Sequence, residues 1–367
     1  MQLLRNSVCI FLGCLCLTLS SHSWAETHVS GYLKSFAVAQ DKFDNELFTT
    51  EPIYQSQNSA RIMLESFTAR TVWLLHYEVS PLFTSESLPV DLATFTRVGG
   101  NYRLTDVQAS LSESEANKNQ VYQNLDRFSV QLQFDAGDLT IGRQAIAFGS
   151  ARIINPTDVF LPFDVRTFNT EYRTGVDAIR FQKPWGELGE VDFGLVLGKE
   201  ANSETSAAFL KVSKNIAGKD LQFTYIDYAQ QSLFGFGLQS AIFDLGFWFE
   251  AASVSGDDHY VRASTGLDYS FSENTFAQIE YHYNGAGSDN SANYLSQLND
   301  VAYQRGGVFM LGEDYLIPNF SAQLSPLWNI GMSVIYNLSD DSSFISFSAE
   351  YNVADNFYMD FGYYHFS

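Results

Sequence analysis

Cysteine is missing from almost the whole chain. The sequence has 367 residues, and its three cysteines all lie close to the amino terminus, at Cys9, Cys14 and Cys16. Beyond this stretch the chain can form no disulfide, offers no thiol nucleophile and has no thiolate ligand for a metal ion. The sequence therefore excludes these three classes of site from residue 26 onward.

Residues 1–25 have the order of a secretory signal peptide. Arg5 supplies the positive n-region, residues 8–19 form the apolar h-region, and Ser23-Trp24-Ala25 fits the small-x-small cleavage rule. We therefore predict export through the Sec pathway and removal of this segment. A lipoprotein signal ending at Cys14 is the alternative, and it would leave a very short h-region.

Basic residues and long apolar runs are also scarce. The chain has 21 Lys and Arg against 42 Asp and Glu, a formal net charge of −21 at pH 7, which becomes −22 when Arg5 is removed. Such an acidic balance argues against nucleic acid as a partner. No segment after the signal reaches the roughly 18 consecutive apolar residues that a membrane helix needs. We expect neither a nucleic-acid interface nor a transmembrane helix.

Apolar and polar residues instead alternate along most of the chain. Hydrophobic residues make up 46% and aromatic residues 15% of the sequence, and a period of two residues indicates strands with one apolar and one polar face. Only helices and closed barrels satisfy every backbone polar group in lipid. The sequence thus predicts an all-β transmembrane antiparallel barrel over residues 26–367. The clearest alternating units are 124–134, 190–199, 221–228, 259–271, 276–283, 326–338 and 344–366.

Short turns and long loops divide these units unequally, as in outer-membrane barrels. We place the long loops outside the cell. The pattern gives about 17 strands, but two chain ends in the periplasm require an even number, so we predict 16 strands, with 18 as the alternative. The short turns lie at 135–138, 186–189, 217–220, 272–274 and 354–356, and the long loops at about 41–55, 81–122, 149–173 and 286–311.

The strand after residue 138 changes phase along its length. Leu139 and Ile141 share one face, whereas Ile146 and Phe148 fall on the other. A β-bulge near Gly142-Arg143 would reconcile the two pairs, because a bulge adds one residue to one strand. An irregularly amphipathic strand without a bulge is the alternative.

Basic and acidic residues gather between residues 124 and 180. Lumen-facing charges are tolerated in a barrel, and opposed basic and acidic walls would select solutes by charge and size. The other interpretation is a salt-bridge lattice that joins strands and fixes the loop. The candidate pore-lining or constriction residues are Arg127, Arg143, Asp158, Asp164, Arg166, Arg173, Asp177 and Arg180.

Three motifs in this region carry a resemblance to known proteins. They are Gly142-Arg143-Gln144 in a strand, Asn155-Pro156-x-Asp158 in a loop, and Gly175-Val176-Asp177-Ala178 in a second strand. Together with the tail from residue 315 to 338, they resemble Gram-negative outer-membrane proteins that include the alginate-export type and porin-like barrels. The resemblance covers about half of the chain and implies an outer-membrane barrel.

Signals for enzymatic chemistry are weak. No Gly-x-Ser-x-Gly motif and no Asp-x-Asp-x-Asp-Gly calcium loop occurs, and no second ligand cluster suggests a metal site. Asp257-Asp258-His259 fits a solvated acidic turn better than an acid–base pair. His282, beside Glu280 on the expected lumen face, fits a pore-lining residue better than a general base. We expect no enzyme, no metal and no cofactor.

The sequence as a whole predicts an outer-membrane channel of a Gram-negative bacterium. It would let small hydrophilic solutes or oligosaccharides diffuse passively, with the 149–173 loop narrowing the lumen. The expected partners are outer-membrane lipid, lipopolysaccharide and the barrel-assembly machinery. The sequence does not decide between a monomer and a homo-oligomer. The acidic balance favours cations, although the arginines could reverse this preference locally. Polysaccharide export is the alternative function, followed by a barrel hydrolase or a surface adhesin that uses the 81–122 loop.

Overall fold

The computed structural model describes most of the chain after the predicted signal peptide, which lies outside the described residues. One long antiparallel sheet dominates the architecture. The described ranges are 26–44, 49–86, 102–105, 110–113, 118–160, 175–257 and 259–367.

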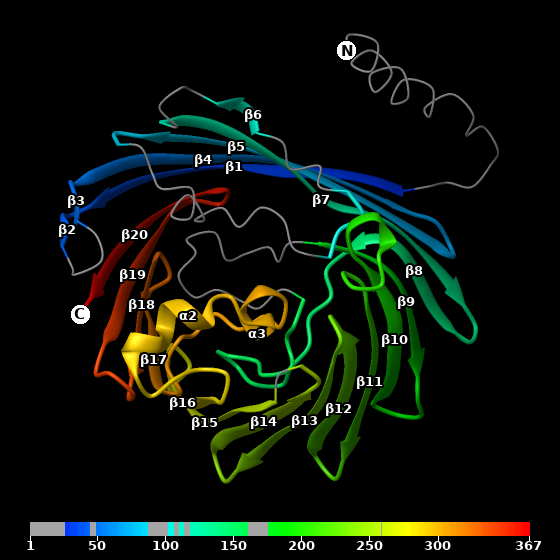
Figure 1. The fold of residues 1–367 in the computed structure, drawn as a ribbon. Helices are drawn as coiled ribbons and strands as arrows, with labels where there is room; N and C mark the ends of the chain where they lie inside the picture. The colour runs from blue at the N-terminus through cyan, green and yellow to red at the C-terminus, as the bar shows by residue number, and fades with distance from the viewer. Residues whose placement is uncertain are drawn as a thin grey trace.

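The sheet contains 17 long strands and one short strand, β6, in the described part of the chain. The strands follow one another around a central space (Figure 1). The long strands are β1 (Glu26–Gln40), β4 (Ile53–Phe67), β5 (Thr71–Thr84), β7 (Asn119–Phe134), β8 (Gly137–Gln144), β9 (Val176–Pro184), β10 (Gly189–Leu197), β11 (Ala207–Ile216), β12 (Lys219–Tyr228), β13 (Gln231–Ile242), β14 (Leu245–Ser255), β15 (Tyr260–Ser272), β16 (Thr275–Asn284), β17 (Asp314–Ser325), β18 (Trp328–Asn337), β19 (Ser343–Ala354) and β20 (Phe357–Phe366).

The connecting segments contain only short elements. Their helices lie mainly between β16 and β17, and none of the described helices is long and apolar enough to cross a membrane. The short elements are β2 (Phe43–Asp44), β3 (Thr49–Thr50), β6 (Ser110–Glu113), η2 (Lys199–Ala201), η3 (Ser291–Asn293), α2 (Tyr294–Gln297) and α3 (Val301–Gln304).

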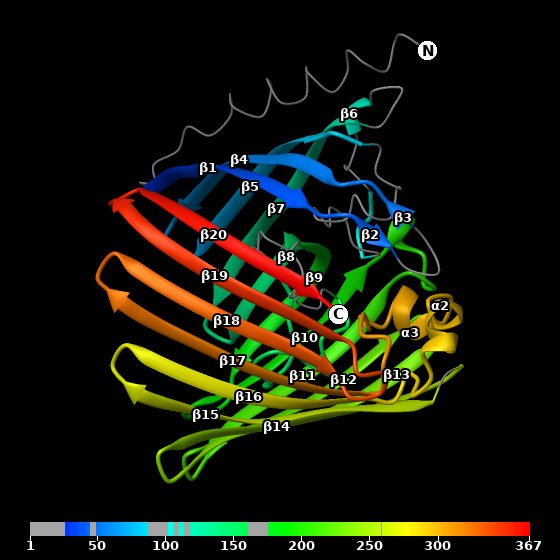
Figure 2. The same ribbon diagram turned by 90° about the vertical axis from the view of Figure 1, so that its left-hand side faces the viewer.

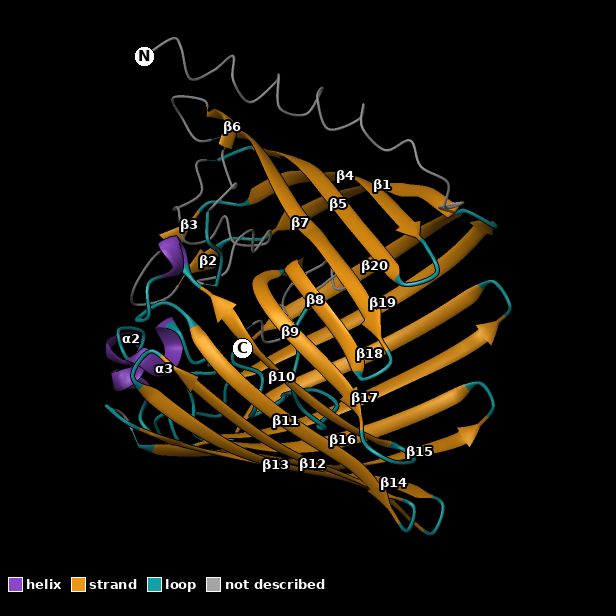
Figure 3. Cartoon of the chain, turned by 90° about the vertical axis from the view of Figure 1, so that its right-hand side faces the viewer, coloured by secondary structure: helices purple, strands orange, loops and turns teal. Residues whose placement is uncertain are grey.

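The predicted all-β antiparallel barrel architecture is confirmed. Neighbouring strands pair in order from β1 through β4, β5 and β7 to β20, and short turns gather at one end of the sheet (Figures 2 and 3). The 17 long strands are one more than the 16 we predicted and one fewer than 18. The alternation itself gave 17, and the rule of even strand number gave 16. With 17 strands, β1 begins and β20 ends at opposite ends of the sheet, not at the same end as expected.

Alternate residues of the strands expose large apolar side chains on the outer face. Phe128 is 50% exposed, Phe193 45%, Phe223 57% and Met332 47%, and the alternation in their units predicts all four on the apolar, outward face. Exposed apolar surface of this extent is unfavourable in water and is typical of a surface that contacts lipid. The period-two pattern therefore located the two faces of the sheet correctly.

No bulge occurs at the position that the sequence suggested. β8 pairs in continuous register with both of its neighbours through Gly142, whose φ is +113°. Ile146 and Phe148 change phase because β8 has already ended and the chain has turned inward. The register shifts instead between β5 and β7, where Asp126 is the extra residue. Asp126 and Arg127 are consequently both buried on the inner side.

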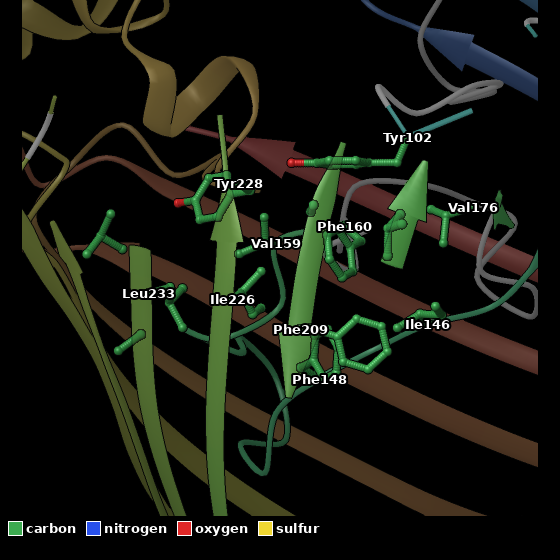
Figure 4. Packing of buried hydrophobic residues seen from close by; sticks show 14 of the residues in the cluster. Tyr102, Ile146, Phe148, Val159, Phe160, Val176, Phe209, Ile226, Tyr228 and Leu233 are labelled. Atoms are coloured by element: carbon green, nitrogen blue, oxygen red, sulfur yellow. The ribbon is translucent and has the colours of Figure 1, made fainter. Parts of the chain in front are cut away.

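An apolar cluster occupies part of the barrel interior. Phe209 of β11, Ile226 of β12 and Leu233 of β13 are buried on the inner face, and side chains from the connecting loops pack against them (Figure 4). The sequence predicted strands with a polar inner face, and it did not show that inner positions near the long-loop end are apolar.

Candidate functional site: a segment held inside the barrel

The chain leaves β8 and enters the barrel as residues 145–160, which we call the inward segment. It overlaps the 149–173 range predicted to narrow the lumen, and residues 161–174, which follow it, lie outside the described residues. Gly149 allows the first bend: its φ is +116°, and a Cβ there would lie 2.1 Å from Oδ1 of Asn155. A side chain at this position would be strained and would collide with the returning loop.

Glu250 of β14 binds the backbone of this segment. Its carboxylate accepts hydrogen bonds from the N–H groups of Ser150 and Ala151, the latter at 2.7 Å. It also accepts from the N–H of Thr157 at 2.9 Å and from the Thr157 hydroxyl at 2.7 Å. Both ends of the 150–157 turn are thus joined to one buried carboxylate.

Glu280 of β16 binds the middle of the same turn. Its carboxylate accepts from the N–H groups of Arg152 and Ile153, both at 3.2 Å, and from that of Ile154 at 2.8 Å. The indole Nε1 of Trp248 donates to it at 2.7 Å. Hydrogen bonds to a charged group contribute about 1.5–3 kcal/mol each. Glu250 and Glu280 therefore replace the hydration of a loop backbone that lies inside the barrel.

Neighbouring strands accommodate the inward segment. The hydroxyl of Ser264 donates to the Ile154 carbonyl at 2.6 Å, and Arg262 Nη1 donates to the Pro156 carbonyl at 3.3 Å. β13 provides space with glycines: a Cβ on Gly235 would lie 2.3 Å from Cγ2 of Thr157. The wall and the segment are therefore complementary in both hydrogen bonding and shape.

Apolar side chains hold the two ends of the inward segment. Phe148 near its start and Phe160 at its end are buried against Phe209, with ring centroids 5.0 and 6.2 Å away. Tyr102, from the β5–β7 loop, packs edge-on against Phe160 at 4.9 Å (Figure 4). Its hydroxyl donates to the Arg305 carbonyl at 3.2 Å. Burial raises the pKa of Tyr102 above its ordinary value, so its hydroxyl stays protonated. The β5–β7 loop, the inward segment and the β16–β17 connection therefore meet at Tyr102 through uncharged groups.

Several of the candidate charges from the sequence form ion pairs along one wall. Arg143 donates through Nε to Asp177 at 2.7 Å, and Asp177 also accepts from the N–H of Leu104 at 2.8 Å. Arg180 pairs with Asp192 at 2.7 Å. These contacts join strands and fix a loop, which matches the lattice interpretation of the charge cluster.

The other candidates divide into two groups. Arg127 is buried beside Asp126 at 2.9 Å, and Asp158 is buried within the inward segment, where its N–H donates to the Asn155 carbonyl. The remaining candidates, Asp164, Arg166 and Arg173, lie outside the described residues.

Sequence reasoning missed Glu250, and it did not connect Glu280 with the loop. The only available signal was a carboxylate at an inward position of each strand. His282, expected to line the pore, faces inward but is fully buried beneath the segment, with Nδ1 2.8 Å from the Ser264 hydroxyl. Asp258 lies outside the described residues. No cluster of three or more metal-ligating side chains occurs in the part of the chain that the structure describes.

Comparisons with known proteins give a likeness in fold. No known protein family and no curated protein matches the chain. Among solved structures, OccK9 (OpdG) of Pseudomonas aeruginosa matches with a TM-score of 0.58 at 7% identity, covering 94% of both chains. OccAB4 of Acinetobacter baumannii matches with a TM-score of 0.56 at 10% identity, covering 94% of this chain and 93% of that one.

These neighbours are porins of the Occ/OprD type from Gram-negative outer membranes. The chain has the fold of an outer-membrane porin. OpdQ of Pseudomonas aeruginosa, with a TM-score of 0.54 at 9% identity over 93% of each chain, has the same fold. The likeness extends over nearly the full length of the porins compared.

Proposed function

We propose that this protein is a channel in the outer membrane of a Gram-negative bacterium, through which small hydrophilic solutes diffuse passively. The observation that carries the proposal is the inward segment, which Glu250 and Glu280 hold by its backbone inside a barrel with an apolar outer face. A fixed loop of this kind narrows a pore without filling it. The function needs no cofactor and no catalytic group.

Unequal charge on the lumen walls supports a preference for cations. The arginines of β8 and β9 are paired with carboxylates. On β19 and β20, Glu350 and Asp360 lie opposite each other on the inner face. A lumen with excess negative charge attracts cations and repels anions.

The refolded mature chain should form ion-conducting pores in planar bilayers. In a KCl gradient the reversal potential should have the sign of K⁺ selectivity, because Glu350 and Asp360 give the β19–β20 wall negative charge. A fully soluble protein that adds no conductance would contradict the proposal, and Cl⁻ selectivity would contradict the charge assignment.

We also propose that Arg143, with Asp177, shapes the conducting path. Replacing Arg143 with alanine removes the cation and its hydrogen bond to the Thr105 carbonyl, and it leaves the Asp177 carboxylate without this partner. K⁺ selectivity should therefore increase, as measured by reversal potential. Lys219→Ala, an exposed substitution at the first residue of β12, is the matched control. Equal reversal potentials for wild type and Arg143→Ala would assign the pair a purely structural role.

Polysaccharide export is the second function that the sequence suggested. The described segment lies inside the barrel and is bound at both ends and in its middle, which suits small solutes better than a polymer chain. We therefore favour diffusion, in contact with outer-membrane lipid and lipopolysaccharide and after insertion by the barrel-assembly machinery. A homo-oligomer is compatible with this function.

A further inference from the structure

Below the inward segment, β16–β20 form an inner wall with regular rows of side chains. Glu280 faces inward, so Gln278 and Phe276 share its face because strand residues alternate with a period of two. Residues paired directly across strands point to the same side, which extends each row to β20. The first row is Gln278, Asn319, Ser333, Ser346 and Tyr364; the second is Phe276, Ser321, Gly331, Ser348 and Gly362; the third is Gln323, Asn329, Glu350 and Asp360.

The part of this wall that the inward segment does not cover is open to solvent. One level above the first row, Glu280, Ile317 and Ile335 are buried. In the second and third rows, Ser321, Ser348 and Gln323 are exposed. A solute that passes the segment would therefore meet this wall.

The rows contain neutral hydrogen-bonding groups and little charge. Amides and hydroxyls both donate and accept hydrogen bonds, as a solute rich in hydroxyl groups requires. Anionic solutes are recognised mainly by Arg and Lys, and residues 263–367 contain a single one, Arg305. Arg305 follows α3 in the β16–β17 connection and donates to the Glu204 carbonyl. Glu350 and Asp360 in the third row would repel a carboxylate or phosphate.

Two aromatic rings give the wall apolar faces. Tyr364 in the first row stacks on Phe344 with ring centroids 5.8 Å apart and an interplanar angle of 15°. Phe276 in the second row lines a pocket of about 390 Å³ together with Ser321, Gln323, Asn329 and Glu273, which lies in the turn before β16. Pockets that bind small molecules have volumes of about 300–1,000 Å³. An aromatic face beside amide and hydroxyl groups suits a sugar ring, which has apolar C–H faces and a hydroxyl edge.

We propose that the β16–β20 wall binds neutral sugars, with the pocket at Phe276 as its principal subsite. This assignment rests on the proposed channel function and specifies its solute class. Gly362 of the second row lets the Tyr364 ring lie against the wall, because a Cβ there would be 2.9 Å from Cε2 of Tyr364.

The experiment measures block of the K⁺ current by maltotriose, with succinate as the anionic comparison. Maltotriose should reduce the current of wild-type channels at lower concentration than succinate does. Phe276→Ala and Gln323→Ala should each raise the half-blocking concentration about tenfold, which corresponds to 1.4 kcal/mol. Phe320→Ala is the matched control, because Phe320 lies on the neighbouring strand and faces outward. Heat-dependent gel mobility confirms that each variant is folded.

The outcomes separate this assignment from the channel function. Stronger block by succinate, unchanged block in Phe276→Ala, or an equal loss in Phe320→Ala would overturn the sugar-binding wall while the channel stands. If neither the wild type nor any variant conducts K⁺, the proposed channel function is wrong. Equilibrium dialysis of maltotriose against the detergent-refolded chain then still tests the wall, because binding requires no current.

Discussion

Channels in which Glu250 and Glu280 are both replaced by alanine should show larger and noisier single-channel conductance than the wild type. The two carboxylates accept eight hydrogen bonds from residues 150–157, each from a different donor atom. Hydrogen bonds to a charge are worth about 1.5–3 kcal/mol each. Without these hydrogen bonds, the backbone N–H groups of the loop would bond to water instead, and the loop would leave the barrel wall.

A matched control separates loop release from a general loss of lumen charge. Glu190→Gln neutralises another inward carboxylate, which pairs with Lys211 at 3.7 Å and does not contact the inward segment. It should leave the conductance and its noise unchanged. Trypsin gives a second measurement, because cleavage after Arg152 should appear only once the segment is released. Wild-type conductance and resistance to trypsin in the double variant would show that the apolar contacts and the hydrogen bonds from Ser264 and Arg262 hold the segment without the carboxylates.

Replacing Asp126 with alanine should lower the stability of the barrel by about 3–5 kcal/mol, the typical cost of removing one partner of a buried ion pair. Asp126 is 1% exposed and contacts Arg61 and Arg127, and it also accepts from the N–H of Gly175 at 2.9 Å. Its loss leaves two guanidinium groups buried without this carboxylate. Urea unfolding followed by the gel-mobility difference between folded and unfolded protein measures the effect.

Asp135→Ala is the control for that experiment. Asp135 lies in the turn after the same strand, 3.6 Å from Arg70, and its side chain is 96% exposed. Exposed ion pairs contribute little to stability, so the unfolding midpoint should stay at the wild-type value. Equal midpoints for Asp126→Ala and Asp135→Ala would show that water already hydrates the Asp126 site.

Local patterns explain which parts of the barrel could be predicted. Phe193 and Met332 were placed on the outer face because alternation depends only on a residue's own strand. The loop at 149–173 was recognised by its length and its Asn-Pro sequence. The prediction of a bulge was wrong because it assigned Ile146 and Phe148 to a strand that ends at Gln144. Where a strand ends depends on its pairing with neighbouring strands, which its own sequence does not show.

The sequence by itself determined the strands, their two faces and the unequal loops, because each of these depends on residues that are close together in the chain. The tertiary structure decided what those elements enclose. Glu250 lies about a hundred positions from the backbone that it binds, and Asp126 meets Arg61 across 65 positions. Such contacts form only when the sheet curves and a loop turns inward, and no local pattern records which inward residues will then meet.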